Sequence, residues 1–225
     1  MLSVLTMTYK RSHILEEAIQ SFLLQDFQDA EMVVLNDSPD VSYVFDHPRV
    51  RVINHPTRFP NLSKKLQYGF TQCQGDWVYR LDDDDLLAPD ALKNVSEWVK
   101  EGKDIVRACK AFYLLNNDYQ GFSDNINNGN VYSKNYLSRV IFSDNSINED
   151  VEITFKQGAE IFTGQEPTMI YRWGGDTFHI SALGVENADK SDYLFNKIEE
   201  RVKEEGIITL NPHFKLQYWD IINPN

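Results

Sequence analysis

The chain is short of cysteine and of long hydrophobic runs, and each shortage excludes a class of protein. Its 225 residues include two cysteines, Cys73 and Cys109, which are too few for a disulfide framework. No run of about 18 apolar residues occurs, which argues against a membrane span. The first six residues lack the basic start and apolar stretch of a signal peptide. We therefore expect a cytoplasmic protein with two buried free thiols and no transmembrane segment.

Positive charge is scarce as well. Lys and Arg total 22 against 34 Asp and Glu, so the formal net charge is -12. Non-specific binding to nucleic acid depends on Lys and Arg, so this balance disfavours it, although it leaves room for a local basic patch. A bound cation would offset part of the surplus. The hydrophobic share of 42% and the length are typical of a globular protein with a substantial core.

Strands and helices alternate through the first half of the chain. β-rich runs predict strands over residues 2–8, 31–35, 50–53, 77–79 and 105–108. Between them, apolar residues at helical spacing predict three helices, which begin at Ser12, Ser63 and Pro89. Glycines at 75 and 102 would end the second and third helices. This alternation indicates an α/β fold with a mostly parallel sheet, in which ligands bind beyond the carboxyl ends of the strands.

The order weakens after about residue 115. Residues 116–130 are rich in Asn, Asp, Gly and Ser, which predicts a loop or a mobile lid. Residues 131–183 suggest short mixed strands, and Ser191 would cap a helix that ends at Gly206. The tail, residues 211–225, is expected to pack through its aromatic side chains. We predict a single domain, 1–225, with a regular half, 1–110, and an irregular half, 111–225.

Four consecutive carboxylates, Asp82 to Asp85, follow an apolar strand. Like charges this close repel and raise one another's pKa, so a fold tolerates them when positive charge lies among them. One interpretation is a solvated acidic turn that opens the following helix. The other is a metal site, because carboxylate oxygens suit Mg or Mn, ions that bind substrate phosphates. We favour the metal site, since polar residues 8–11 and 36–37 end other strands at the same predicted edge.

Five segments resemble, in order and spacing, the family 2 glycosyltransferases, GT-A enzymes that use nucleotide sugars. They are Thr8-Tyr9-Lys10-Arg11, Leu35-Asn36-Asp37-Ser38, Asn61 to Gly69, Gly75 to Asp85, and Pro89-Asp90-Ala91-Leu92. The likeness covers residues 2–110 and continues more loosely through 148–156, which is similar to the family's ED segment. It implies a GT-A, Rossmann-like fold in which 1–110 binds the nucleotide sugar and the irregular half, 111–225, carries the acceptor side and the catalytic base.

The resemblance implies roles around the nucleotide. Thr8, Tyr9 and Arg11 would line the nucleotide pocket, and Asp37 would hydrogen-bond the base. Lys65 and its neighbour Lys64 are unusual for the family. They either reach the diphosphate or lie on a solvated helix face, and the solvated face is the favoured reading.

The resemblance also divides the acidic run. Asp82 would contact the ribose or the sugar, and Asp84 matches the family's metal-binding aspartate. Asp83 takes a variable place beside the nucleotide sugar, and Asp85 is a supporting acidic group.

A further carboxylate and a histidine come from the second half. Asp150 falls where inverting members have their catalytic base, although a carboxylate at a helix N-terminus is the alternative reading. Asp176 is a weaker candidate for the same role. His179 is either a ligand of the metal or a core residue, and Trp173 either stacks on a sugar or lies in the core.

We therefore predict an inverting glycosyltransferase that depends on Mn or Mg and moves a sugar from a UDP-sugar donor to a hydroxyl acceptor. The acceptor is a glycan or a hydroxylated nucleobase of modified DNA. The lack of a transmembrane segment favours a soluble or peripheral acceptor complex over a processive membrane synthase. One alternative is a nucleotidyltransferase, which would normally show a Gly-rich basic loop near the N-terminus, unlike residues 8–11. The other is a non-catalytic protein that binds nucleotide sugars.

Overall fold

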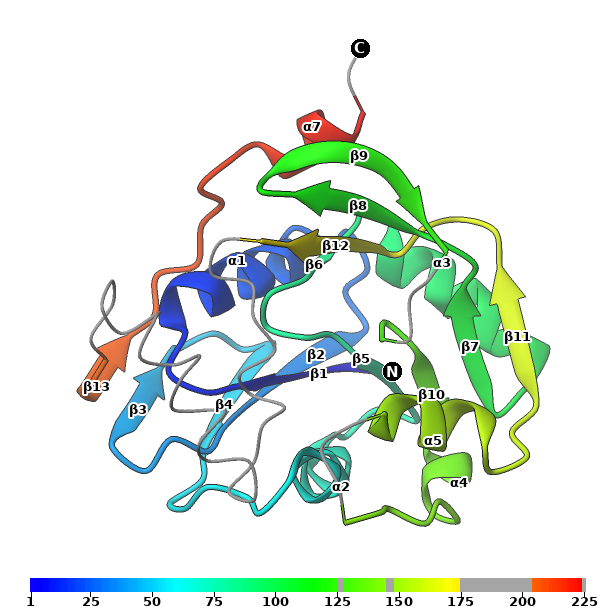
Figure 1. Ribbon diagram of the computed structural model, residues 1–225, viewed down its shortest axis with the longest axis horizontal. Helices are drawn as coiled ribbons and strands as arrows, with labels where there is room; N and C mark the ends of the chain where they lie inside the picture. Colours follow the sequence, from blue (N-terminus) through cyan, green and yellow to red (C-terminus); the bar gives the residue numbers. More distant parts are fainter. Residues whose placement is uncertain (125–127, 145–147, 175–203, 224–225) are drawn as a thin grey trace.

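The computed structural model describes residues 1–124, 128–144, 148–174 and 204–223. These residues form a seven-stranded sheet, a four-stranded sheet and a two-stranded sheet (Figure 1). The seven-stranded sheet has the order β11-β7-β10-β5-β1-β2-β4. In that order its strands are Ile161–Gly164, Ile105–Ala108, Val131–Ser133, Trp77–Arg80, Leu2–Thr8, Ala30–Asn36 and Val50–Asn54.

All neighbouring strands of this sheet run parallel except β10, which is antiparallel to both β5 and β7. The prediction of a mostly parallel sheet is confirmed. Successive side chains of β1 point to opposite faces, so Val4 and Leu5 belong to two separate hydrophobic clusters. Because both faces are covered, every residue of β1 is buried, as a central parallel strand requires.

Helices cover both faces of the sheet (Figure 1). One face carries α1, Ser12–Leu23, and α3, Ala91–Trp98, which continues into the 3-10 turn η1, Val99–Glu101. The opposite face carries α2, Leu62–Gln72, α4, Lys134–Leu137, and α5, Glu149–Phe155. No helix in the described ranges is both long enough and apolar enough to cross a bilayer.

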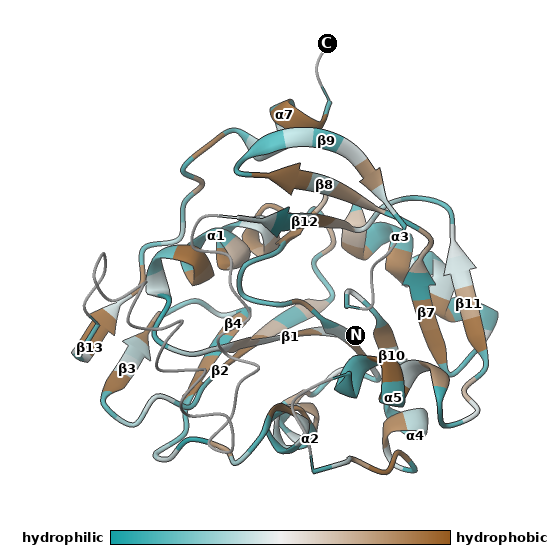
Figure 2. Cartoon of the chain, viewed as in Figure 1, coloured by the Kyte–Doolittle hydropathy of each residue, from teal (hydrophilic) through white to brown (hydrophobic). Residues whose placement is uncertain are grey.

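The four-stranded sheet has the order β6-β12-β8-β9. Its strands are Leu86–Leu87, Met169–Trp173, Ala111–Leu115 and Asp118–Ser123, and the C-terminal helix α7, Tyr218–Ile222, packs against it. Figure 2 shows α7 and β8 as largely hydrophobic. Phe214, Tyr218 and Trp219 join this cluster, so the prediction that the tail packs through its aromatic side chains is confirmed up to residue 223.

The two-stranded sheet pairs β3, Val41–Val44, in parallel with β13, Gly206–Thr209. It joins a segment that follows β2 to one near the C-terminus. The helix expected from Ser191 to Gly206 lies mostly outside the described residues, and Gly206 itself begins β13.

The predicted helix starts were wrong by one or two residues. Arg11, not Ser12, precedes the first turn of α1, and the Ser12 N–H is bound by the carboxylate of Glu204, 2.7 Å away. Asn61, not Ser63, caps α2 by accepting the Lys64 N–H. Similarly, α3 begins at Ala91, two residues after Pro89, and Gly102 ends η1 at φ 67° as expected.

Two other predictions were wrong in part. Residues 118–123 form β9 rather than a loop, because Asn116 and Asn117 adopt positive φ and turn the chain back onto β8. Asn-rich hairpin turns and loops share a composition, so the sequence did not separate them. Cys73 is buried as expected, whereas Cys109 is partly exposed.

The strand order of the central sheet reverses at β1, whose neighbours are β2 on one side and β5 on the other. The connections through α1 and α2 therefore lie on opposite faces, and the carboxyl ends of β1 and β5 border a topological switch point, where open α/β sheets bind ligands. Thr8 ends β1, and Asp82 follows the end of β5 by two residues. The fold thus brings the acidic run to the position where a ligand is expected.

Candidate active site

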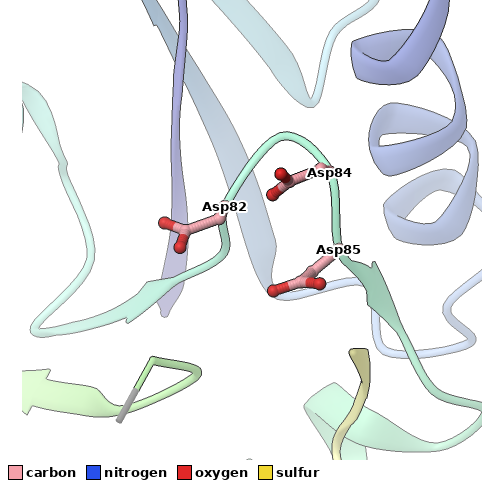
Figure 3. A group of neighbouring side chains, drawn as sticks. All are labelled: Asp82, Asp84 and Asp85. Carbon is pink, nitrogen blue, oxygen red and sulfur yellow. The ribbon is translucent and has the colours of Figure 1, made fainter. Parts of the chain in front are cut away.

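The acidic run forms a tight loop between β5 and β6 (Figure 3). The Asp85 N–H donates to the Asp82 carbonyl at 3.1 Å and closes the turn. Asp82, Asp84 and Asp85 each offer a carboxylate oxygen, and the three atoms lie within 4.8 Å of one another. Asp84 and Asp85 direct their carboxylates into the loop from one arm, and Asp82 lies on the other arm. We call these three residues the acidic triad.

The fourth carboxylate, Asp83, faces a different partner. Arg11, at the entrance to α1, donates through Nε to Asp83 Oδ2 at 3.2 Å and through Nη1 to Asp84 Oδ2 at 3.3 Å. Both Arg11 and Asp83 are fully buried. Burial opposes the charged form of Arg11, but Asp83 and Asp84 hold its pKa above the ordinary value. The geometry therefore favours Arg11 and Asp83 as an internal ion pair that supports the loop.

The triad retains acceptor capacity for a cation. Asp84 Oδ1 is buried and accepts no hydrogen bond from the described residues. Burial, together with the negative charge of Asp84 and Asp82, raises the pKa of Asp85 well above its ordinary value. A divalent cation would satisfy the orphaned oxygen and relieve the repulsion. The donor set consists of carboxylate oxygens, which fits Mg²⁺ or Mn²⁺. The residues present therefore fit such an ion.

Arg80, the last residue of β5, connects the triad to the second half of the chain. Its Nε donates to Asp82 Oδ1 at 3.2 Å, and its Nη1 lies 2.9 Å from Glu149 Oε1 at the start of α5. Asn128 reaches the triad from the other side, with its Nδ2 2.7 Å from Asp85 Oδ2 and 3.2 Å from Asp82 Oδ2. Side chains from two separate segments thus orient the carboxylates.

Arg172 on β12 holds the last part of the loop. Its N–H donates to Asp85 Oδ1 at 3.0 Å, and its guanidinium donates to the Asp84 carbonyl. The same guanidinium contacts Glu17 Oε2 at 2.7 Å and the Tyr218 hydroxyl at 3.2 Å. Arg172 therefore ties α1, the acidic loop, β12 and the C-terminal tail together.

On the other side of β1, Lys65 and Asp37 form a buried pair. Lys65 Nζ donates to Asp37 Oδ1 at 2.6 Å and to the Thr8 carbonyl at 2.8 Å. Burial lowers the pKa of Lys65, although the charge of Asp37 opposes this. Asp37 Oδ2 accepts the Phe59 N–H at 3.0 Å. The prediction that Lys65 lies on a solvated helix face was wrong, because the carboxyl end of β2 presents a carboxylate to this side of α2.

The neighbouring residues are less deeply enclosed. Tyr9 is half-buried, and the Arg58 guanidinium lies over its ring, 4.2 Å from the centroid. Lys64 pairs with Asp144 at 2.9 Å and remains partly exposed, as a helix-face lysine would. The pair formed by Tyr9 and Arg58 offers a flat surface beside the end of β1, which is the type of surface on which a nucleobase stacks.

The start of α5 presents two carboxylates in different environments. Glu149 is buried against Arg80, and burial raises its pKa while Arg80 opposes the rise. Asp150 is partly exposed, and its Oδ1 accepts the Val151 N–H at 2.8 Å. Asp150 is therefore the more accessible of the two. The other candidates from the second half, Asp176 and His179, lie outside the described residues.

Four side chains that hold the triad or its neighbours in place were not predicted from the sequence: Arg80, Asn128, Glu149 and Arg172. Arg80 had a visible signal, because an arginine inside an apolar strand must find a carboxylate when it is buried. The others carry no local signal, since their partners in β5 and the acidic run lie 43 to 88 positions away in the chain. Asp85 was predicted to be a supporting acidic group, but in the structure its carboxylate is one of the three that could bind a metal ion.

The fold and the acidic triad together define a GT-A architecture, and comparisons with known proteins agree. The profile of glycosyl transferase family 2 matches residues 3–162. This match covers most of the chain, so the chain belongs to glycosyl transferase family 2.

Two curated relatives match part of the chain. One is the GalNAc(5)-diNAcBac-PP-undecaprenol beta-1,3-glucosyltransferase of Campylobacter jejuni, 33% identical over 108 residues, which are 45% of this chain and 35% of that protein. The other is an uncharacterized glycosyltransferase of Haemophilus influenzae, 28% identical over 107 residues, which are 44% of this chain and 40% of that protein. The matched region therefore spans well under half the length of either relative.

Solved structures share the fold at low identity. S. aureus TarS 1–349 in complex with UDP-GlcNAc superposes with a TM-score of 0.65 at 18% identity, covering 91% of this chain and 68% of that one. The mannosyltransferase PcManGT from Pyrobaculum calidifontis, in complex with GDP-Man and Mn²⁺, gives a TM-score of 0.59 at 17% identity, covering 90% and 65%. These likenesses confirm the predicted GT-A fold.

Proposed function

We propose that this chain is an inverting, metal-dependent glycosyltransferase that moves a sugar from a UDP donor to a hydroxyl group of a glycan. The observation that carries the proposal is the acidic triad at the switch point, with a buried Asp84 oxygen that accepts no hydrogen bond within the described part of the chain. UDP-GlcNAc is bound by the similar TarS structure, and the Campylobacter relative is named for glucosyl transfer to a lipid-linked glycan. Both observations support this donor and acceptor class.

Asp82, Asp84 and Asp85 would hold the divalent cation, and Asp82 would also contact the sugar donor. When bound, the cation supplies positive charge that stabilises the diphosphate as it leaves. Arg80 and Asn128 hold Asp82, so its carboxylate is oriented before the donor arrives. Arg11 balances the charge beneath the loop, which keeps four neighbouring carboxylates compatible with a folded protein.

Asp150 is our candidate for the catalytic base. In this mechanism the acceptor oxygen attacks the anomeric carbon as the bond from that carbon to the UDP oxygen breaks. The hydroxyl proton passes to the Asp150 carboxylate, and UDP departs with the bonding electron pair. Two features support the assignment: Asp150 is partly exposed, and its neighbour Glu149 is tied through Arg80 to Asp82. The helix that carries the base is thereby linked to the triad.

The decisive experiment measures release of UDP from UDP-Glc, UDP-Gal, UDP-GlcNAc and UDP-GalNAc, with Mn²⁺ and with EDTA, and uses GDP-Man as a comparison donor. We expect slow hydrolysis of one UDP-sugar that requires the metal. Asp84→Asn should lower the rate of this hydrolysis about 10²- to 10³-fold. Asp76→Asn is the matched control, because Asp76 is an exposed carboxylate just before the opposite end of β5. Metal-independent release would contradict the proposed role of the metal, whereas no release from any donor would contradict the transferase and favour a non-catalytic binding protein.

A further inference from the structure

Three aromatic side chains line one face of the four-stranded sheet. Tyr113 on β8 and Tyr171 on β12 are direct neighbours in the parallel register. Their rings stack with centroids 6.0 Å apart and planes inclined by 26°. Trp173 follows two residues along β12, its ring 6.4 Å from that of Tyr171 and inclined by 39°. We call Tyr113, Tyr171 and Trp173 the aromatic row.

The row runs from the interior to the surface. Side chains alternate along β12, so Met169, Tyr171 and Trp173 share a face. Met169 is buried, Tyr171 is partly exposed and Trp173 is 43% exposed. The other face of the sheet carries Phe112 and Ile170 and is covered by α7. The tail that covers the far face therefore leaves the rings of the row partly open to solvent.

The strand β12, which carries Tyr171 and Trp173, adjoins residues that contact the acidic triad. The Met169 sulfur lies 3.1 Å from the position that a Cβ on Gly129 would occupy. The preceding residue, Asn128, donates to Asp82 and Asp85. In addition, the backbone N–H of Arg172, between Tyr171 and Trp173, donates to Asp85 Oδ1. Tyr171 and Trp173 therefore flank Arg172, whose backbone N–H contacts the triad.

The outer end of the row borders a hollow. Of the row, Trp173 alone lines a cavity of about 310 Å³, whose other lining residues include His13, Asn116, Asn117, Arg172, Lys215 and Tyr218. Amides and an ammonium group are donors and acceptors suited to hydroxyl groups. The row therefore combines flat apolar rings with polar groups at its exposed end, which is the usual composition of a small-ligand site.

We propose that the aromatic row is the acceptor subsite and stacks a neutral pyranose ring of the acceptor glycan. The inference rests on the proposed function and deepens it. A pyranose has one face formed by C–H groups, which packs on the negative face of an aromatic ring, while its hydroxyl groups point outward. The neighbouring carboxylates of the triad disfavour an anionic sugar. The proposed donor elements, Tyr9 and the pair of Lys65 and Asp37, lie at β1, β2 and α2, whereas the row lies on β8 and β12.

The test uses methyl β-D-glucopyranoside and methyl 2-acetamido-2-deoxy-β-D-glucopyranoside as probes, with UDP and Mn²⁺ present. Saturation-transfer NMR, with irradiation of the aromatic protons of the protein, reports which sugar protons contact a ring and yields the Kd. We expect transfer to the C–H protons of one sugar face. Tyr113→Ala and Trp173→Ala should each raise the Kd about three- to tenfold, and Trp173→Phe should largely restore binding.

The matched control is Phe122→Ala, because Phe122 is a half-exposed aromatic residue of the same sheet whose ring packs, tilted by 35°, against Phe112 on the far face. Its Kd should equal that of the parent protein. An equal Kd in all variants, or no binding of either glycoside to the parent protein, overturns the subsite. Glycoside binding that depends on the row without any UDP release would support the subsite and sink the transferase, whereas UDP release with row-independent binding would do the reverse.

Discussion

The two halves of the molecule differ in how far the side chains proposed to meet ligands are exposed, although buried ion pairs occur in both. In residues 1–110, Arg11 and Lys65 are buried against carboxylates of neighbouring loops, so charge is neutralised inside the protein before any ligand arrives. In the second half, Asp150 and the aromatic row stay partly exposed. We infer that buried ion pairs preorganise the proposed donor side, whereas the proposed acceptor side offers partly exposed surfaces to a partner.

The largest expected effect tests the exposed carboxylate. Asp150→Asn removes the proposed base and keeps the shape, so kcat for transfer should fall about 10²- to 10⁴-fold. The Kd values for UDP and Mn²⁺ should stay within about twofold of the parent values, because Asp150 is not part of the triad. Turnover and calorimetric titration measure the two quantities. Unchanged turnover would move the base elsewhere, with Asp176 as the next residue to replace.

Replacement of the buried, positively charged side chain of Arg11 should have the largest effect on stability. Arg11→Met leaves Asp83 and Asp84 without their partner, and loss of one member of a buried pair costs about 3–5 kcal/mol. Arg139→Met is the control, because Arg139 is exposed and pairs with Asp104 at the surface, where a pair contributes about 0–1 kcal/mol. Urea unfolding gives both values. Equal losses would mean that the first half does not depend on internal neutralisation.

Two neighbouring carboxylates of the loop should separate activity from stability. Asp84→Asn removes an oxygen ligand and should lower kcat/KM for donor hydrolysis about 10²- to 10³-fold. Asp83→Asn should lower stability more than Asp84→Asn does, because Asp83 is the main partner of Arg11. Manganese titrations and urea unfolding of both variants give the comparison. The reverse pattern would assign the metal to Asp83.

Glycines test the packing of each half. A Cβ at Gly75 would lie 2.7 Å from the Ser3 backbone nitrogen, so Gly75→Ala forces two backbone segments apart and should cost about 2–3 kcal/mol. At Gly164 the clash, 2.2 Å, is with the ring of Trp98. That ring can shift, so Gly164→Ala should cost about 1–2 kcal/mol. Thermal unfolding decides whether the first half is the less tolerant one.

The smallest expected effect concerns Glu17, which links the halves through Arg172. Burial works against the charged carboxylate, but Arg172 and its hydrogen bond outweigh this and lower the pKa of Glu17. A depressed folded-state pKa gives stability that is present above the unfolded pKa and is lost as the pH falls towards the folded one.

Unfolding free energy should therefore decrease from about pH 5 downward, and Glu17→Gln should reduce that decrease by about 1 kcal/mol. Glu97→Gln, at an exposed i,i+3 pair with Lys100, should leave the profile unchanged. Urea unfolding between pH 3 and 7 provides the measurement. Identical profiles for all three proteins would remove Glu17 as the acid-sensitive link.

The strands and helices of the first half were predicted from local sequence patterns. The apolar runs of β1, β2 and β5 and the helical spacing in α1 and α2 are short-range signals, and the structure has those elements. The position of β10, antiparallel between β5 and β7, depends on a long-range pairing that no local pattern shows. The capping of α1 is similar, because the acceptor for the Ser12 N–H is the distant Glu204.

Amino-acid order by itself determined the alternation of strands and helices, the placement of Asp82 to Asp85 after a strand, and the resemblance to family 2 glycosyltransferases, because these depend on residues close together in the chain. Only the tertiary structure decided which carboxylates face one another. It assigned Asp83 to Arg11, left Asp84 Oδ1 without a partner among the described residues, and brought Arg172, on the strand that carries Tyr171 and Trp173, into contact with the triad. Charge neutralisation and ring stacking act over a few ångströms in space, and folding alone sets those distances.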